Sequence, residues 1–200
     1  MNQIQENLVE LTRAAAENSA ESGSGLAAFS GSQFAMKNGI EITLRLIRPD
    51  DESLMTKFHQ TLSDHSVYMR YFCSLSLRSR VSHERLVKVC HVDRDREMAI
   101  VADHKDKATG QHEILGVGRL IKLRAHEAEV AILVADQHQK QGLGTELLRR
   151  AVQIARKERL SKVSAKMLRD NFAVQSIFKK LGFRLRLLAD PSTISAVLDL

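Results

Sequence analysis

Two glycines that follow an apolar run restrict the fold of this 200-residue chain more than any other feature of its sequence. Residues 127–135 alternate as a strand does, Gly142 and Gly144 follow a short polar loop, and apolar residues then recur at helical spacing. Glycine has no Cβ, so its backbone can approach a ligand closely, and the amides at a helix start attract negative charge. This segment therefore predicts a binding site for an anionic group such as a pyrophosphate.

Two common phosphate-binding motifs do not fit this loop. A dinucleotide-binding fold needs a third glycine, but Leu147 stands in that position, and the region at 160–166 is basic where an acidic residue is required. A P-loop needs Gly-Lys-Ser or Gly-Lys-Thr after its glycines, and neither follows here. On the loop alone, a helix start whose glycines only permit a tight turn stays open as an alternative.

The charge distribution also indicates an anionic ligand. Residues 138–188 contain 13 Lys or Arg and 3 Asp or Glu, whereas the net charge of the whole chain is +6. A solvated helix face or a nucleic acid would suit such a segment too. However, the aromatic content of 4% offers little for base stacking, and no helix-turn-helix, zinc-finger or RNA-binding signature is present. We therefore expect a small phosphorylated cofactor and no nucleic-acid partner.

The remaining pattern predicts a mixture of strands and helices. Strands are expected at 40–46, 97–103, 114–123, 127–135, 162–168, 183–188 and 193–200. Helices are expected near 51–62, 64–71, 83–91 and 143–159, and from Asn171 to Gly182. Asp50, Ser63 and Ser82 are the expected N-caps of the first three helices. This order of elements indicates an α+β domain.

Residues 1–38 differ in composition from the rest of the chain. They are rich in Ser, Gly, Ala, Asn and Glu, so we expect a flexible tail before a folded domain at 39–200, although Ile4, Leu8 and Leu11 allow a short amphipathic helix. The sequence has no apolar run of about 18 residues and does not begin like a secretion signal. We expect a cytoplasmic protein with no membrane partner, and Cys73 and Cys90 as reduced thiols.

The glycine loop and a later segment together resemble a known family. Gln139-x-x-Gly142-x-Gly144 after a strand resembles the pyrophosphate loop of GNAT N-acetyltransferases, and Asn171 with the ending Lys180-Leu181-Gly182-Phe183 resembles their second cofactor segment. The resemblance covers residues 40–200 and implies a mixed, strongly bent sheet of about seven strands flanked by helices, with acetyl-CoA as co-substrate. It assigns to the cofactor Ile132, Leu133, Val134, Gln139, Lys140, Gln141, Gly142, Leu143, Gly144, Thr145, Asn171 and Phe178.

A second stretch resembles a narrower group. The residues Phe58-His59-x-x-Leu62-Ser63-x-x-Ser66-Val67-Tyr68-x-Arg70-Tyr71-Phe72, with 83–86 and 95–99 after them, look like the catalytic domain of bacterial protein-lysine acetyltransferases that modify acyl-CoA synthetases. This likeness implies acetyl transfer to a protein lysine, with an acyl-CoA synthetase as a candidate partner. Two alternatives stay open: an N-acetyltransferase for a small amine (a polyamine, amino acid or drug), and a non-catalytic acyl-CoA-binding regulatory module. A homodimer is also left open.

Acetyl transfer to an amine requires a base. A lysine with a pKa of about 10.4 is almost wholly protonated at pH 7, and only the neutral amine attacks a thioester. Alternation places Glu129 on the strand face opposite Val130 and Ile132, and this residue matches the base position of the lysine acetyltransferases that the chain resembles. Glu127, Asp136 and Glu97 compete for the role, and Glu129 could instead be an ordinary charge on a solvated strand face.

Three further expectations concern the leaving thiolate, a metal site and two tyrosines. Many GNAT enzymes carry a tyrosine acid four residues before their Gly-Phe pair, but Phe178 stands there, so the thiolate would leave unaided or take its proton from water. His83, Cys90 and His91 share a predicted helix face without the spacing of a metal motif, so no metal site is expected. Tyr68 and Tyr71 could contact the substrate, although tyrosines in such positions more often pack.

Overall fold

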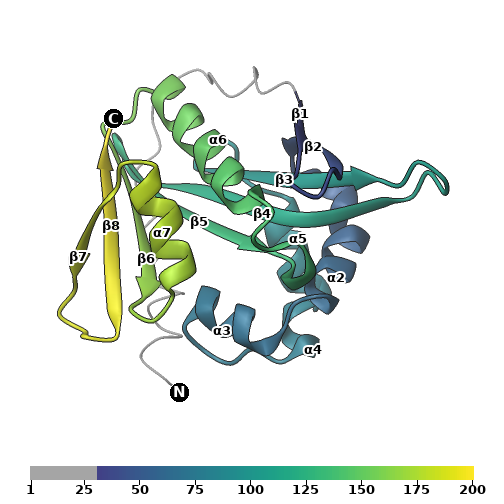
Figure 1. The fold of residues 1–200 in the computed structure, drawn as a ribbon, viewed down its shortest axis with the longest axis horizontal. Coiled ribbons are helices and arrows are strands. Elements are labelled where there is room, and N and C mark those ends of the chain that lie inside the picture. Colours follow the sequence, from purple (N-terminus) through teal and green to yellow (C-terminus); the bar gives the residue numbers. More distant parts are fainter. Residues whose placement is uncertain (1–30) are drawn as a thin grey trace.

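The computed structural model describes residues 31–200, which form a mixed sheet with helices on both faces (Figure 1). The strands are β1 (Ser32–Ala35), β2 (Glu41–Leu46), β3 (Glu97–Lys105), β4 (His112–Arg124), β5 (Glu127–Val134), β6 (Lys162–Leu168), β7 (Arg184–Leu187) and β8 (Thr193–Asp199). They lie in the order β1-β2-β3-β4-β5-β6-β8-β7. Neighbouring strands are antiparallel except β5 and β6, which are parallel. The predicted α+β class is confirmed, with eight strands in the described part in place of about seven.

The helices divide between the two faces of the sheet. They are η3 (Pro49–Asp51), α2 (Glu52–Gln60), α3 (Asp64–Tyr71), α4 (Leu77–Arg80), α5 (His83–Cys90), η4 (Asp136–His138), α6 (Leu143–Lys157) and α7 (Phe172–Lys180). Helices α6 and α7 cover one face and share a core with it, whereas α2, α3 and α5 pack against the other face (Figure 1). Within the described residues no helix is long and apolar enough to cross a bilayer.

Strand β5 shows how the alternation of side chains serves the two faces. Ala128 and Val130 are buried in the core under α6 and α7, with Ile132 and Val134 packed against it. Leu133 packs instead against the core of α2, α3 and α5. Because side chains alternate along a strand, Glu129 lies on the same face as Leu133, the face that α3 covers. The predicted alternation is thus confirmed, and it places Glu129 on the side of the sheet opposite α6.

The expected boundary between tail and domain needs a correction. Strand β1 lies inside the range expected to be a tail and pairs with β2 from Ser32↔Leu44 to Ala35↔Glu41. Its four residues, SQFA, contain only one large apolar side chain, and Phe34 packs against the core that α6 shares with the sheet. Pairing with β2 therefore overrides a weak local pattern. The rest of the expected tail, including the helical spacing of Ile4, Leu8 and Leu11, lies outside the described residues.

The expected N-cap of the first helix is also wrong. A short helix, η3, precedes α2, and Asp51 rather than Asp50 holds this turn by accepting a hydrogen bond from the backbone N–H of Arg48 at 2.8 Å. The same carboxylate receives two hydrogen bonds from Arg45, each 2.7 Å long, and Arg45 also donates to Asp103 at 2.8 Å. A buried ion network thus fixes the start of α2. Ser63 caps α3 as predicted, by accepting from Ser66 N–H at 3.1 Å.

Candidate active site

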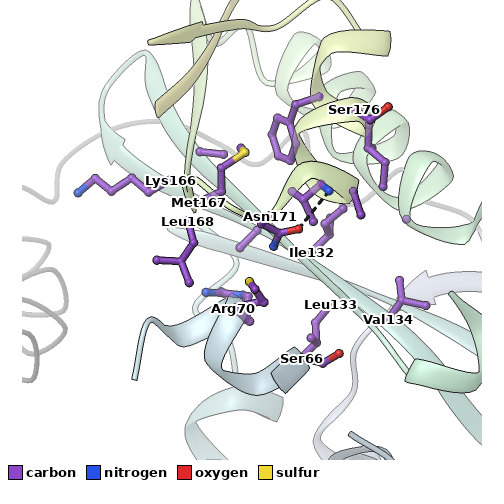
Figure 2. Close-up of a pocket in the computed structure, with 18 of the residues that line it drawn as sticks. Ser66, Arg70, Ile132, Leu133, Val134, Lys166, Met167, Leu168, Asn171 and Ser176 are labelled. Atoms are coloured by element: carbon purple, nitrogen blue, oxygen red, sulfur yellow. Dashed lines mark hydrogen bonds between the residues drawn. The ribbon is translucent and has the colours of Figure 1, made fainter. Parts of the chain in front are cut away.

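Strands β5 and β6 part soon after they meet. They pair over only three positions, from Glu127↔Lys162 to Glu129↔Ser164, and α3 contacts both strands. A cavity of about 1100 Å³ opens between them and extends along α7 (Figure 2). It slightly exceeds the usual range of small-molecule pockets, about 300–1,000 Å³. The space is therefore large enough for an extended cofactor together with part of a second substrate.

The predicted pyrophosphate loop forms one end of this cavity. Gly142 has φ 89°, a left-handed conformation that residues with a Cβ rarely adopt, and it is the N-cap of α6. The first backbone hydrogen bond of this helix runs from Glu146 N–H to Gly142 C=O, so the three preceding amides have no partner within the helix. Gly142, Gly144 and Thr145 line the cavity. The geometry suits an anion on the helix start.

Gly144 allows α6 and α7 to approach each other at the cavity. A Cβ on this residue would lie 3.2 Å from Ile177 Cδ1 and 3.5 Å from Ile132 Cδ1. The two glycines thus have different roles, because Gly142 provides the backbone turn and Gly144 provides space.

A lysine from the turn between β1 and β2, the first hairpin, lines this end of the cavity. Lys37 follows β1, and its backbone N–H donates to the carbonyl of Gln141 at 3.2 Å. Its side chain lines the cavity, as does that of Lys140. Sequence analysis missed Lys37 because the residue falls in the segment expected to be a tail. Two basic residues on the wall of this end, in addition to the helix start, favour a phosphate there.

A polar network links the loop to α3. The Asp136 carboxylate accepts hydrogen bonds from Ser63 N–H at 2.9 Å, Ser63 Oγ at 2.6 Å and Ser66 Oγ at 2.8 Å. The side-chain amide of Gln139 donates to Ser66 Oγ at 3.1 Å and to the carbonyl of Val134 at 3.2 Å. Partial burial opposes ionisation of Asp136, but the hydrogen bonds from the serines outweigh it and lower the pKa of Asp136. The network fixes the start of α3 beside the loop.

Helix α7 forms the second wall of the cavity. The side chain of Asn171 accepts a hydrogen bond from Val174 N–H at 3.2 Å and so caps the helix, as predicted (Figure 2). Phe178 lies on the cavity wall but is 1% exposed, and its ring packs edge-on against Phe183 with centroids 4.8 Å apart. Phe178 is therefore mainly a core residue, and it has no proton to donate to a leaving thiolate.

Glu129 lies where β5 and β6 separate, and it lines the cavity. Among the described residues, no group forms a hydrogen bond or ion pair with its carboxylate. The three competing acids are different: Glu97 pairs with Arg119, Glu127 pairs with Lys162 at 2.5 Å, and Asp136 is bound to the serines of α3. None of these three lines the cavity. Glu129 is thus the most available carboxylate of the four.

Helix α3 lines the cavity near Glu129 with six residues, which are His65, Ser66, Tyr68, Met69, Arg70 and Tyr71. Arg70 lies on the cavity wall, and its guanidinium carbon is 5.0 Å from the centroid of the Tyr71 ring (Figure 2). On the same ring, the guanidinium carbon of Arg85 lies 5.1 Å from the centroid. Tyr68 borders the cavity and is 44% exposed, so it can meet a ligand that enters from the surface. Both tyrosines thus line the cavity, Tyr71 against two guanidinium groups and Tyr68 at the exposed rim.

The residues considered as metal ligands are dispersed. His83 Nδ1 lies 2.6 Å from Glu52 Oε1, Cys90 is buried in the core, and His91 is exposed. Within residues 31–200, no three His, Cys, Asp or Glu side chains are grouped so that they could hold a metal ion.

Most of the residues assigned to the cofactor from sequence meet at this one cavity. Its wall includes Ile132, Leu133, Val134, Gln139, Lys140, Gly142, Gly144, Thr145, Asn171 and Phe178. Leu143 is instead a buried core residue, and Gln141 contributes its backbone carbonyl to Lys37. The wall also contains Lys166 and the turn between β7 and β8, from Leu188 to Thr193, which sequence analysis did not assign. The pairing of β6 with β8, together with a hydrogen bond of 2.8 Å from Arg169 N–H to the carbonyl of Ser192, brings that turn to the site.

In this α+β domain, β5 and β6 part after Glu129, and the cavity in the gap extends to the glycine loop that follows β5. Such a domain can hold a phosphorylated cofactor beside a carboxylate. Residues 41–184 match the family described as Acetyltransferase (GNAT) domain. Because this match covers more than half of the chain, the protein belongs to the GNAT acetyltransferases.

Several solved structures share the fold of this chain. The GNAT domain of S. lividans PAT is 23% identical, with a TM-score of 0.74 over 90% of this chain and 100% of that one. The PaiA N-acetyltransferase of Thermoplasma acidophilum, in complex with coenzyme A, is 18% identical, with a TM-score of 0.62 over 80% and 99%. A cAMP-binding acyltransferase from Mycobacterium smegmatis is 22% identical, with a TM-score of 0.56; the alignment covers 87% of this chain and 49% of that longer protein.

Proposed function

We propose that this protein transfers acetyl from acetyl-CoA to the side-chain amine of a protein lysine, with Glu129 as the general base. One observation carries the proposal: the Glu129 carboxylate lies on the cavity wall where β5 and β6 part, without a partner among the described residues. Asp190 is the other acid on that wall, but its carboxylate accepts hydrogen bonds from Ser192 and holds its own turn. Glu129 is therefore the group that is available to accept a proton.

The cavity has the features that acetyl-CoA requires. The unpartnered amides at the start of α6, with Lys37 and Lys140 beside them, would bind the pyrophosphate. Beyond Glu129 the edge of β5 is not paired with β6, so its backbone groups are available to the amides of the pantetheine arm. Ile132, Val134 and Ile177 supply apolar contacts. Bound in this way, acetyl-CoA supplies an activated acyl group near the parting of the strands.

The reaction needs one proton to be removed. The amine nitrogen forms a bond to the thioester carbonyl carbon, the carbon–sulfur bond breaks, and the proton from nitrogen passes to Glu129 directly or through one water. The thiolate leaves without help from Phe178, which is tolerable because a thiol is far more acidic than an alcohol. The task of the protein is thus to orient the amine and to hold its proton.

Two features favour a protein lysine as the acceptor. Several residues on the acceptor side of the cavity are exposed, among them Tyr68, Lys166 and Leu188, so the cavity opens to the surface between α3 and the turn after β7. A lysine side chain that projects from another protein could enter there, whereas a deep closed pocket would favour a small amine. The likeness of 58–72 to the lysine acetyltransferases that modify acyl-CoA synthetases supports the same acceptor class.

The role of Glu129 is tested by Glu129→Gln, which keeps the shape of the side chain and removes its basicity. We expect the Kd for acetyl-CoA to stay the same and turnover of a lysine peptide to fall about 100-fold or more. The pH–rate profile of the variant should also differ from that of the wild type. Isothermal titration and thiol release measure the two effects.

The matched control is Glu127→Gln, two residues earlier on β5. This carboxylate pairs with Lys162 and lies away from the cavity, so its loss should leave turnover close to that of the wild type. An unaltered pH–rate profile in Glu129→Gln, or an equal loss in both variants, would be inconsistent with a base at Glu129.

A further inference from the structure

Arg70 has an unusual environment for an arginine. It is half-buried on the wall of the cavity, yet no described residue accepts a hydrogen bond from it or forms an ion pair with it. The buried Arg45 has two aspartates, the buried Arg80 has Asp64, and Arg119 has Glu97. Arg85 also lacks a carboxylate, but it does not line the cavity. Arg70 is thus an arginine that faces the cavity with its donors unused.

The surroundings of Arg70 make an additional anion favourable. Desolvation lowers the pKa of Arg70, and the nearby Arg119 and Arg85 lower it further, whereas Tyr71 and Glu129 act in the opposite direction. A partly desolvated guanidinium with positive neighbours is stabilised by a carboxylate that reaches it.

The Tyr71 ring holds the guanidinium in place. The guanidinium carbon of Arg70 lies over this ring, 5.0 Å from its centroid, and that of Arg85 lies 5.1 Å from the same centroid. A stacked guanidinium keeps its in-plane N–H groups available, and these match the two oxygens of a carboxylate. The group is therefore oriented before a ligand arrives.

The anion that Arg70 would bind belongs to the acceptor and not to the cofactor. The amides of α6 serve the opposite face of the sheet, where Val130 and Ile132 of β5 point. Arg70 instead comes from α3, which covers the face that carries Glu129. Glu129 and Arg70 thus offer one negative and one positive charge on the same side of the cavity.

We propose that Arg70 binds a carboxylate of the acceptor and so selects amines that have a carboxylate close by. This inference rests on the proposed acetyl transfer. In a protein, the carboxylate would be an Asp or Glu next to the target lysine, and the amine would lie toward Glu129. An acceptor with both groups complements both charges, whereas a bare ammonium would be repelled by Arg70.

The test compares matched acceptors. Two peptides differ only in one residue beside a central lysine, Glu in one and Gln in the other, and free lysine is compared with cadaverine, which lacks the carboxylate. We expect wild-type kcat/KM to be about tenfold or more higher for the acidic peptide, mainly through KM, as expected for a charge-assisted hydrogen bond. In Arg70→Gln the ratio of kcat/KM for the acidic peptide to kcat/KM for the neutral peptide should fall to about one. Arg70→Lys should restore part of this preference.

The control is Arg78→Gln, which removes the same charge from the exposed helix α4, outside the cavity. This variant should keep the wild-type ratio. Equal kcat/KM for both members of each acceptor pair in the wild type, or a preference that persists in Arg70→Gln, would overturn the inference.

The two acceptor pairs also separate this inference from the proposed function. Acetylation of both peptides with no acidic preference would leave lysine transfer intact and remove the role of Arg70. The protein could instead acetylate neither peptide, prefer free lysine to cadaverine, and lose this preference in Arg70→Gln. That result would support Arg70 as a carboxylate site and contradict a protein acceptor.

Discussion

At the scale of single residues, Gly144 allows helices α6 and α7 to lie close together. We expect Gly144→Val to raise the Kd for acetyl-CoA about tenfold or more, because the new methyl groups would occupy the space between α6, Ile177 and Ile132. Gly144→Ala should have a smaller effect, since the terminal methyl of Ile177 can shift by a few tenths of an ångström. Titration calorimetry measures the affinities, and an unchanged Kd in the valine variant would contradict this role.

The sequence predicts the conformation or orientation of a residue where a backbone rule or the alternation of a strand determines it. Gly142, the Asn171 cap and the face of Glu129 all follow from local patterns. Residues such as Lys37 and Arg70 could not be assigned in this way. Their positions depend on the contact of the first hairpin with the loop and on the packing of α3, neither of which has a local signal.

At the scale of elements, Asp136 connects the end of β5 to the start of α3. Its carboxylate accepts three hydrogen bonds from Ser63 and Ser66, so Asp136→Asn should lower the free energy of unfolding by about 1 to 3 kcal/mol. Because the pKa of Asp136 is lowered in the folded state, this contribution is present above its unfolded pKa and is lost as the pH falls through the folded value. Urea unfolding at several pH values measures both effects.

A suitable control for this substitution is Asp170→Asn. Asp170 is exposed, and its carboxylate accepts no hydrogen bond from the described residues. Equal unfolding free energies for the two variants would show that Asp136 does not hold α3 in place.

The helices and strands with a clear apolar spacing or a cap could be predicted from the sequence, whereas several of the shortest elements could not. Strand β6 and helix α3 lie at the predicted positions, because apolar spacing and the Ser63 cap define them. Strand β1, η3 and α4 were missed, since each has only three or four residues and depends on tertiary contacts. The parting of β5 and β6, which creates the site, has no local signal either.

At the scale of the whole molecule, the free energy of unfolding should depend on pH through His59. This residue of α2 is 2% exposed, its Nδ1 has no partner among the described residues, and burial together with the charges of Arg85 and Arg80 lowers its pKa to about 4. The unfolded chain binds the proton more readily, so the stability that is present above about pH 6.5 is lost as the pH falls toward 4. The loss should amount to about 3 kcal/mol.

Replacement by an apolar residue tests this dependence. His59→Leu should remove the decrease of about 3 kcal/mol in the free energy of unfolding between pH 6.5 and 4. His65→Gln, at an exposed position, should keep this decrease. Denaturant unfolding across this range compares the three proteins, and an identical pH dependence in His59→Leu and the wild type would contradict a neutral buried imidazole.

The central claim is that the acetyl group passes from acetyl-CoA to protein lysine. Its most direct test is incubation of the protein with acetyl-labelled acetyl-CoA and whole-cell extract, followed by measurement of the label in the protein and metabolite fractions. We predict that most of the label appears in protein, on lysine Nζ by peptide mass spectrometry, and that Glu129→Gln abolishes most of it. Label mainly in small molecules would contradict the account.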